Sequence, residues 1–108
     1  MQFACPAIQI SEHTLVTVSI SAPSRGQLSL GLTNPWGDYS QLLTRREADT
    51  SGEGFVDWTF QTVHFWGTDP NGEFLLLLEH GPKSFGQALL RNVRLTVYGY
   101  ANKEGIAR

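Results

Sequence analysis

Short runs of alternating apolar and polar residues, separated by turns rich in glycine and proline, constrain the fold of this chain most strongly. Residues 14–20 and 27–33 each carry apolar side chains at every second position, which is the period of a strand with one buried face. Between them, residues 22–26 read APSRG. This is a turn, because proline fixes φ and glycine supplies positive φ. Two alternating runs joined by a short turn predict a β-hairpin.

The same pattern continues to the C-terminal part of the chain. Further strands are expected over residues 39–43, 55–66, 73–80 and 93–99. Turns are expected where glycine and proline cluster, at 34–38 and 67–72. The polar segments 45–54 and 81–92 are interpreted as loops, and the tail 102–108 as a frayed end.

The longest of these runs, residues 55–66, lies within the stretch 51–72, which is expected to form the centre of the β core. Five aromatic and four β-branched residues in its twelve positions argue against a helix. Both faces carry apolar side chains, which fits a strand buried on both sides or a strand twisted in its middle. About six strands and no convincing helix predict an antiparallel β-sandwich, in which the pattern alone does not distinguish a jelly roll. With 108 residues, the chain is expected to form a single domain over 1–108.

Composition excludes several classes of partner. The formal charge is −2 and the eight Lys and Arg residues are scattered, so no concentrated basic field is offered to nucleic acid or anionic lipid. The longest apolar run, residues 74–78, is far too short for a membrane segment. The first residues, MQFACPAIQ, lack the basic and apolar regions of a signal peptide. A single cysteine, Cys5, leaves open whether it is an inert small side chain or half of a disulfide.

Residue types that can catalyse reactions or bind metals are present, but their spacing does not define a site. No serine lies in a Gly-x-Ser-x-Gly elbow, so no catalytic residue is assigned. The three histidines, His13, His64 and His80, lack the paired spacing of zinc ligands. Calcium is a minority hypothesis for loop carboxylates, and no metal ligand is assigned; the acidic residues concerned are Asp49, Glu53, Asp57 and Asp69.

Some aromatic and basic residues allow two interpretations each. His64, expected in the middle of a strand, is either satisfied by a hydrogen bond or acts as a pH-sensitive group. The three tryptophans belong to the core or to a partner interface, or else stack on a sugar or a base; they are Trp36, Trp58 and Trp66. Arg45-Arg46 is ordinary surface charge or a processing site.

The stretch EGFVDWTFQTVHFWGTDPNGEF closely resembles the P domain, or Homo B domain, of furin- and kexin-like proprotein convertases. The positions that match the family pattern are Gly54, Phe55, Asp57, Trp58, Phe60, Thr62, His64, Trp66, Gly67, Asp69, Pro70 and Gly72. Weaker matches extend the resemblance over residues 8–100, including Asn34-Pro35-Trp36-Gly37 and the closing Leu95–Gly99.

The resemblance implies a jelly-roll β-sandwich that follows a subtilisin-like catalytic domain, packs on it and supports its folding. Such a domain carries no catalytic triad and no cofactor, whereas the parent serine endopeptidase requires calcium and cleaves proproteins after paired basic residues in the secretory pathway. An exposed apolar face is then expected to contact the catalytic domain, with Trp36 and Trp66 as candidates. The alternative is a free-standing jelly-roll module that binds glycans or a receptor through surface aromatic residues.

Departures from the family pattern carry information of their own. The family module begins further upstream, so the chain is expected to lack its first strand or two. Cys5 resembles the second cysteine of a family disulfide, whose partner would lie in that upstream segment. Arg25-Gly26-Gln27 replaces the Arg-Gly-Asp of many members, which leaves an adhesive role for this tripeptide without support.

Overall fold

A computed structural model describes residues 1–46, 49, 51–81 and 88–101 of the chain. These residues form eight strands and one turn of 3-10 helix: β1 (Gln2–Phe3), β2 (Ile10–Ser21), η1 (Arg25–Gln27), β3 (Leu28–Thr33), β4 (Tyr39–Leu43), β5 (Phe55–Thr62), β6 (Gly72–Glu73), β7 (Leu75–His80) and β8 (Leu89–Tyr100). The expected frayed tail at 102–108 and parts of both expected loops lie outside the described residues. No helix in the described ranges is long and apolar enough to cross a membrane.

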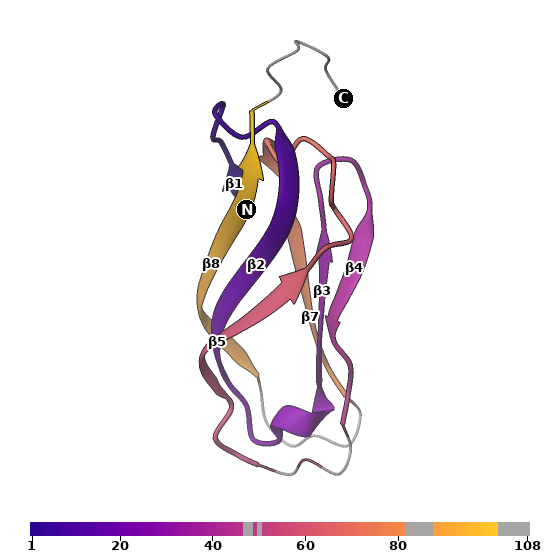
Figure 1. Cartoon of the computed structure of the whole chain (residues 1–108). Coiled ribbons are helices and arrows are strands. Elements are labelled where there is room, and N and C mark those ends of the chain that lie inside the picture. The colour runs from indigo at the N-terminus through magenta and orange to yellow at the C-terminus, as the bar shows by residue number, and fades with distance from the viewer. Residues whose placement is uncertain (47–48, 50, 82–87, 102–108) are drawn as a thin grey trace.

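The strands form two three-stranded antiparallel sheets with the core between them (Figure 1). One sheet has the order β5-β2-β8 and the other β4-β3-β7, while β1 and β6 form a short pair at one end. Alternate residues of β2 and β3 fill the core, each at most 2% exposed: Val16, Val18, Ile20, Leu28, Leu30 and Leu32. The prediction of an antiparallel all-β fold is confirmed. Its jelly-roll connectivity stays a prediction.

The predicted hairpin between the first two long strands is wrong. β2 pairs with β5 and β8, whereas β3 pairs with β4 and β7. The turn at 22–27 therefore carries the chain from one sheet to the other. The apolar face of β2 meets the apolar face of β3 across the core, which removes both faces from water in one step. A hairpin would have placed the two faces side by side.

The central position assigned to residues 55–66 is also wrong. β5 ends at Thr62 and lies at the edge of its sheet, beside the central strand β2. The apolar residues on both faces do not reflect burial on both sides, since Val56 is 72% and Trp58 40% exposed. The register against β2 shifts between Val18 and Ile20, opposite Asp57, whose φ is 50°. A bulge of this kind redirects the side chains that follow it.

The remaining strands follow the sequence pattern with one change of boundary. β4 spans the predicted residues 39–43, and β6 with β7 covers 72–80 except Phe74. The last strand begins at Leu89 rather than at residue 93. It starts earlier because β8 pairs with β2 over the whole length of that strand, from Ser21 opposite Leu89 to Ile10 opposite Tyr100.

Candidate docking surface

Residues 63–71, called here the end loop, cross one end of the sandwich between β5 and β6 (Figure 1). Two of its side chains point into the protein: Phe65 is 1% exposed and Pro70 is among the fully buried residues. Three others are exposed: Val63 at 50%, Trp66 at 52% and His64. The loop therefore has an anchored inner side and a partly apolar outer side.

Backbone and side-chain hydrogen bonds hold the end loop rigidly against the start of β2. The amide of Ser11 donates to the carbonyl of Thr68 at 2.9 Å, and the amide of Gly67 donates to the carbonyl of Ser11 at 2.8 Å. The hydroxyl of Ser11 donates to the carbonyl of Phe65 at 2.6 Å. Because these backbone groups are satisfied, the end loop has a defined path across this end of the sandwich.

Asn71 ties the same loop to the N-terminal segment. Its side-chain amide donates to the carbonyl of Ile8 at 2.9 Å and to Asp69 Oδ1 at 2.8 Å. Its side-chain oxygen accepts the amide of Cys5 at 2.6 Å. Cys5 itself is a free thiol of intermediate exposure, and the disulfide implied by the resemblance stays a prediction. The sequence does not predict that Asn71 and Ser11 join these segments, because Cys5 and Ile8 lie more than fifty residues from Asn71, and Phe65 lies more than fifty residues from Ser11.

The candidates Trp36 and Trp66 both lie at this end of the molecule, and both are more than half exposed. Trp36 Nε1 donates to the carbonyl of Asp69 at 2.9 Å, which fixes the indole on the end loop. The turn that carries Trp36 is closed by Asn34 Oδ1, which accepts the amides of Trp36 and Asp38 at 3.1 and 2.8 Å. The ring of Trp66 meets the His13 ring edge-on at 5.4 Å between centroids.

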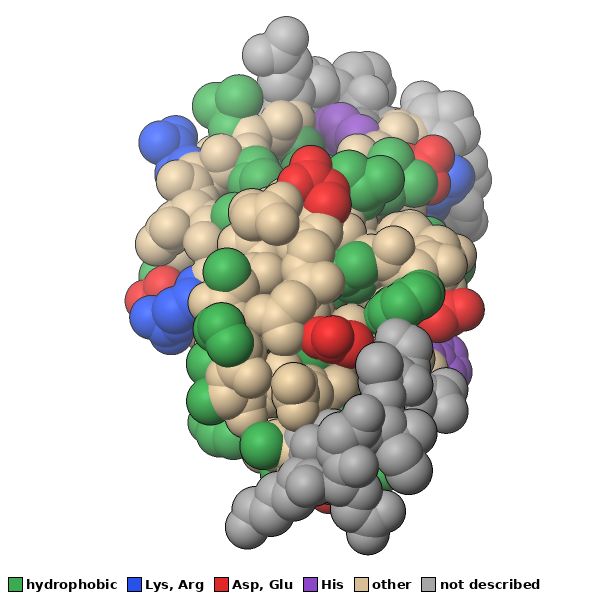
Figure 2. Space-filling model, turned by 90° about the horizontal axis from the view of Figure 1, so that it is seen from above, with side chains coloured by type: hydrophobic (Ala, Val, Ile, Leu, Met, Phe, Trp, Pro, Cys, Tyr) green, Lys and Arg blue, Asp and Glu red, His purple; other side chains and the backbone are tan. Residues whose placement is uncertain are grey.

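Seen end-on, this face is not uniformly apolar. Figure 2 shows hydrophobic side chains in separate groups, with acidic side chains among them and Lys and Arg at the margins. Tyr98, opposite His13 in the pairing of β2 with β8, adds another aromatic residue that is 57% exposed. Large aromatic side chains held on a rigid frame and ringed by polar groups are typical of the centre of a protein interface.

His64 serves to connect the two sheets. It lies beyond the end of β5, so its predicted place in the middle of a strand is wrong. Its Nδ1 lies 2.9 Å from the hydroxyl oxygen of Ser40 on β4, and that hydroxyl lies 2.7 Å from the hydroxyl of Thr62. Ser40 is 2% exposed. A buried hydroxyl that already bonds a threonine is positioned for structure rather than for attack on a substrate.

The other signature residues have structural surroundings as well. Phe55 is 1% exposed and packs edge-on against Trp58 and Phe60, at 4.5 and 6.0 Å between centroids. Asp57 accepts a hydrogen bond from the Ser19 hydroxyl at 3.3 Å. The three signature glycines all have positive φ, as turns of this shape require: Gly54, Gly67 and Gly72.

The loop carboxylates considered for calcium are dispersed. Asp49 bonds two arginines, and Asp69 Oδ1 accepts the amide of Asn71 at 2.9 Å. Within the described ranges, no three His, Cys, Asp or Glu side chains converge as metal ligands would.

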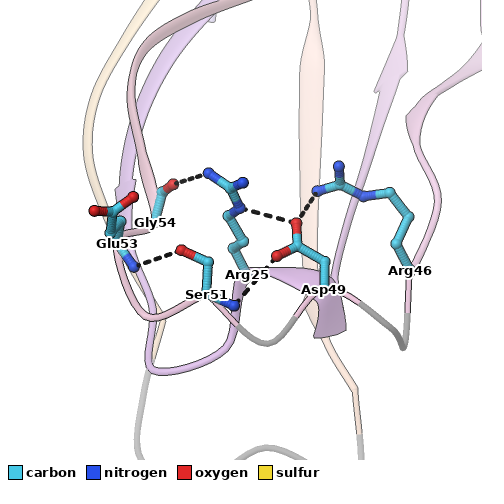
Figure 3. A network of polar contacts seen from close by, with 6 residues as sticks. All are labelled: Arg25, Arg46, Asp49, Ser51, Glu53 and Gly54. Carbon is cyan, nitrogen blue, oxygen red and sulfur yellow. Dashed lines mark hydrogen bonds and ion pairs between the residues drawn. The ribbon is translucent and has the colours of Figure 1, made fainter.

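Asp49 instead organises the opposite end of the sandwich (Figure 3). Its Oδ2 accepts a hydrogen bond from Arg25 Nε at 2.9 Å and lies 3.4 Å from Arg46 Nη2, while its Oδ1 accepts the amide of Ser51 at 3.2 Å. Arg25 also lies over the Trp58 ring at 5.2 Å from its centroid. The hydrogen bond from Arg25, followed by that from Ser51, lowers the pKa of Asp49 below its ordinary value of 3.8.

This arrangement predicts a pH-dependent contribution to stability. Because the pKa of Asp49 is lowered in the folded state, its contribution is present above the unfolded value of 3.8 and is lost as the pH falls below it. Asp49→Asn should therefore lower the thermal midpoint at pH 7, and the difference from wild type should shrink toward pH 3. Glu73→Gln, at an exposed acidic residue on β6, is the control. A difference of equal size at both pH values would contradict this assignment.

The fold and these contacts define a class of protein: a small β-sandwich with a rigid aromatic surface at one end, suited to packing on a partner. A family described as "Proprotein convertase P-domain" matches residues 11–97. The chain belongs to this family.

Individual relatives agree with that assignment. "Proprotein convertase subtilisin/kexin type 6" of Rattus norvegicus is 43% identical over 94 residues, which cover 83% of this chain and 10% of that protein. "Furin-1" of Xenopus laevis is 40% identical over 101 residues, covering 94% and 13%. A solved complex of an Aeromonas sobria serine protease with its chaperone has the same fold over 95% of this chain and 20% of the matched chain, with a TM-score of 0.66 at 18% identity. The chain thus spans about a tenth of these curated relatives.

Proposed function

We propose that this domain packs onto a subtilisin-like catalytic domain and stabilises it, within a calcium-dependent serine endopeptidase that processes proproteins at paired basic residues in the secretory pathway. The chain itself does no chemistry in this role. Family membership supports the class of parent protein. Calcium would bind to the catalytic domain rather than to these residues.

The observation that carries the proposal is the pair of exposed indoles on a rigid end. Trp36 and Trp66 leave 56% and 52% of their surface in water although hydrogen bonds fix the backbone beneath them. Exposing rigid aromatic surface to water has a free-energy cost in an isolated domain, and this cost is removed when a partner covers the surface. Tryptophan is also among the residues most enriched at interface hot spots.

A rescue experiment tests this function. A convertase catalytic domain without its own P domain would be co-expressed with and without this chain, and cleavage of a fluorogenic dibasic substrate would be measured in the secreted fraction. Activity that appears only with the chain supports the proposal. A chain that leaves activity at background, yet binds an immobilised glycan array, would favour the free-standing binding module instead.

The two indoles should be required for much of the protease activity that the chain rescues. Trp36→Ala combined with Trp66→Ala is expected to lower the rescued activity at least about tenfold, since removing a hot-spot aromatic costs about 2 kcal/mol or more. The thermal midpoint of the isolated domain should change little, because both side chains are largely exposed. The control is Val56→Ala, at a residue on β5 that is 72% exposed. If the double variant rescued activity as well as wild type, the docking surface would have to lie elsewhere.

A further inference from the structure

The pair Arg45-Arg46 follows β4 and reaches the end of the sandwich that Asp49 organises (Figure 3). It is the one place in the sequence where two Lys or Arg residues are adjacent. Both arginines are exposed, as is Thr44 before them. Their side chains are therefore accessible from solvent, whereas access to the peptide bond after Arg46 depends on how its backbone is held.

The backbone of Arg46 is hydrogen-bonded on both sides of its Cα. Its amide donates to the carbonyl of Gly26 at 2.7 Å, and its carbonyl accepts the amide of Asp49 at 2.8 Å. The amide of Gly26 donates in turn to the carbonyl of Asp49 at 3.1 Å. These three hydrogen bonds, called here the Gly26 clamp, join Arg46 and Asp49 to η1. Both backbone polar groups of Arg46 are thus occupied within the folded domain.

The Gly26 clamp closes because residue 26 has no side chain. A Cβ at Gly26 would overlap the backbone carbonyl oxygens of both Arg46 and Asp49. Gly26 is not among the glycines with positive φ, so glycine is required here for the close approach of two backbone segments. Any larger residue at this position would push the clamp open.

The side chains of the pair are also held at this end. Arg46 Nη2 lies 3.4 Å from Asp49 Oδ2, and the guanidinium carbon of Arg46 lies 5.8 Å from the centroid of the Phe55 ring. Arg45 passes beside Gly81, where a Cβ would lie 3.0 Å from Arg45 Cδ. Contacts from three other parts of the chain therefore fix the pair in the folded domain.

This arrangement is incompatible with cleavage by an endopeptidase. A peptide segment that binds to another protein as an extended strand does so through its own backbone amides and carbonyls. Arg46 cannot offer these groups while the Gly26 clamp is closed, and the carbonyl that a protease would attack is bonded to Asp49. The pair becomes cleavable only when this end of the domain opens. The rate of cleavage then follows the population of the open form.

We propose that Arg45-Arg46 is a conditional cleavage site, at which an endopeptidase specific for paired basic residues hydrolyses the peptide bond after Arg46 when the Gly26 clamp is open. Water adds across this bond and leaves a carboxylate on Arg46 and an amino group on the next residue. That the parent protease belongs to this class rests on the proposed function. A domain that fails to close this end is then a substrate for the class of enzyme that it supports.

Cleavage at this place makes the loss of an open domain irreversible. The central strands β2 and β3 precede Arg46, whereas β5, β7 and β8, which pair with them, follow it. The covalent link between the two parts keeps them at high effective concentration while the chain refolds. Once that link is cut in an open chain, the two parts have to meet from solution. A closed domain keeps its link because the clamp protects it.

Two glycine variants test the clamp in the full chain. Gly26→Ala should open it, whereas Gly37→Ala places a Cβ at the other end of the molecule, where no heavy atom lies within 4 Å. Each variant would be incubated with purified furin, and the products would be identified by mass spectrometry. Gly26→Ala should be cleaved after Arg46 at least about tenfold faster than wild type, because steric overlap shifts the domain toward its open form. Gly37→Ala should be cleaved at nearly the wild-type rate.

Asp49→Asn keeps the test valid if Gly26→Ala does not fold. This variant leaves the backbone bonds of the clamp in place and removes the charge that holds the Arg46 side chain. Cleavage after Arg46 should rise at least about threefold, as expected for loss of one charge-assisted contact. Glu73→Gln, at an exposed acidic residue on β6, should leave the rate unchanged.

Trypsin, which requires a single basic residue, serves as the second protease. Adding Arg45→Ala to Gly26→Ala should abolish cleavage by furin after Arg46 but not cleavage by trypsin. Wild type cut as fast as Gly26→Ala would overturn the proposal, as would equal rates for Gly26→Ala and Gly37→Ala, since opening would then be global. Cleavage of Gly26→Ala by trypsin but not by furin would overturn the assignment to proteases specific for paired basic residues. The proposed function is judged separately, because the rescue experiment measures cleavage of an added substrate.

Discussion

Replacing Phe65 with alanine is expected to lower the free energy of unfolding by about 3–5 kcal/mol, the cost of removing a large buried aromatic side chain. Phe65 is 1% exposed and meets the Phe74 ring edge-on at 6.2 Å between centroids. Phe74 in turn meets Phe3 at 6.5 Å, so the three rings connect the end loop to β1. Urea denaturation would measure the loss, which is a large share of the 5–15 kcal/mol typical of a whole domain.

A neighbour in the same loop provides the matched control. Val63 is 50% exposed, and Val63→Ala should change the free energy of unfolding by no more than about 0.5 kcal/mol. Similar losses for the two variants would mean that Phe65 does not anchor the end loop.

Comparing Phe65→Ala with the tryptophan variants separates the effect on stability from the effect on docking. Trp66 follows Phe65 directly, and the carbonyl of Phe65 accepts the hydroxyls of Ser11 and Thr68, both at 2.6 Å. Loss of the Phe65 ring should therefore release Trp66 as well as destabilise the core. The tryptophan variants remove docking area and leave the core intact. If the tryptophan variants lower the rescued activity without lowering stability, the loss is therefore due to the docking surface and not to the core.

The sequence pattern predicted strands well where turns bounded them. Leu28–Thr33 and Tyr39–Leu43 were recognisable because apolar alternation stops at residues whose conformations end a strand, such as the Asn34–Asp38 turn. Local signals of this kind depend on a few neighbouring residues. They therefore survive in a single sequence without knowledge of the tertiary fold.

The pairing of strands was not predictable in the same way. A short turn after β2 fits a hairpin and a crossing between sheets equally well, and only burial of both apolar faces decides between them. The bulge at Asp57 likewise concealed that β5 is an edge strand, because its aromatic residues appear on both faces of a regular strand pattern. The contact between His13 and Trp66 is not predictable for a related reason, since 53 positions separate them along the chain.

Gly54→Ala is expected to lower the free energy of unfolding by about 2–5 kcal/mol, from a backbone term and a steric term together. Gly54 has φ of 67°, which an alanine adopts only with strain. A Cβ at this buried position would also overlap the backbone carbonyl of Ile20. Displacing Gly54 would in addition weaken its carbonyl as an acceptor for Arg25 Nη1, at 3.5 Å, and so loosen the cluster around Asp49.

The variant Gly37→Ala separates the backbone term from the steric term. Its φ is 88°, but a Cβ there would have no heavy atom within 4 Å, so Gly37→Ala reports the backbone term alone, about 1–2 kcal/mol. The excess loss in Gly54→Ala is then the steric term, set by how closely the start of β5 approaches β2. Urea denaturation of both variants would measure it. Equal losses would show that β5 can move away from Ile20 at little cost, and the opening glycine of the family signature would then be needed for its φ and not for its size.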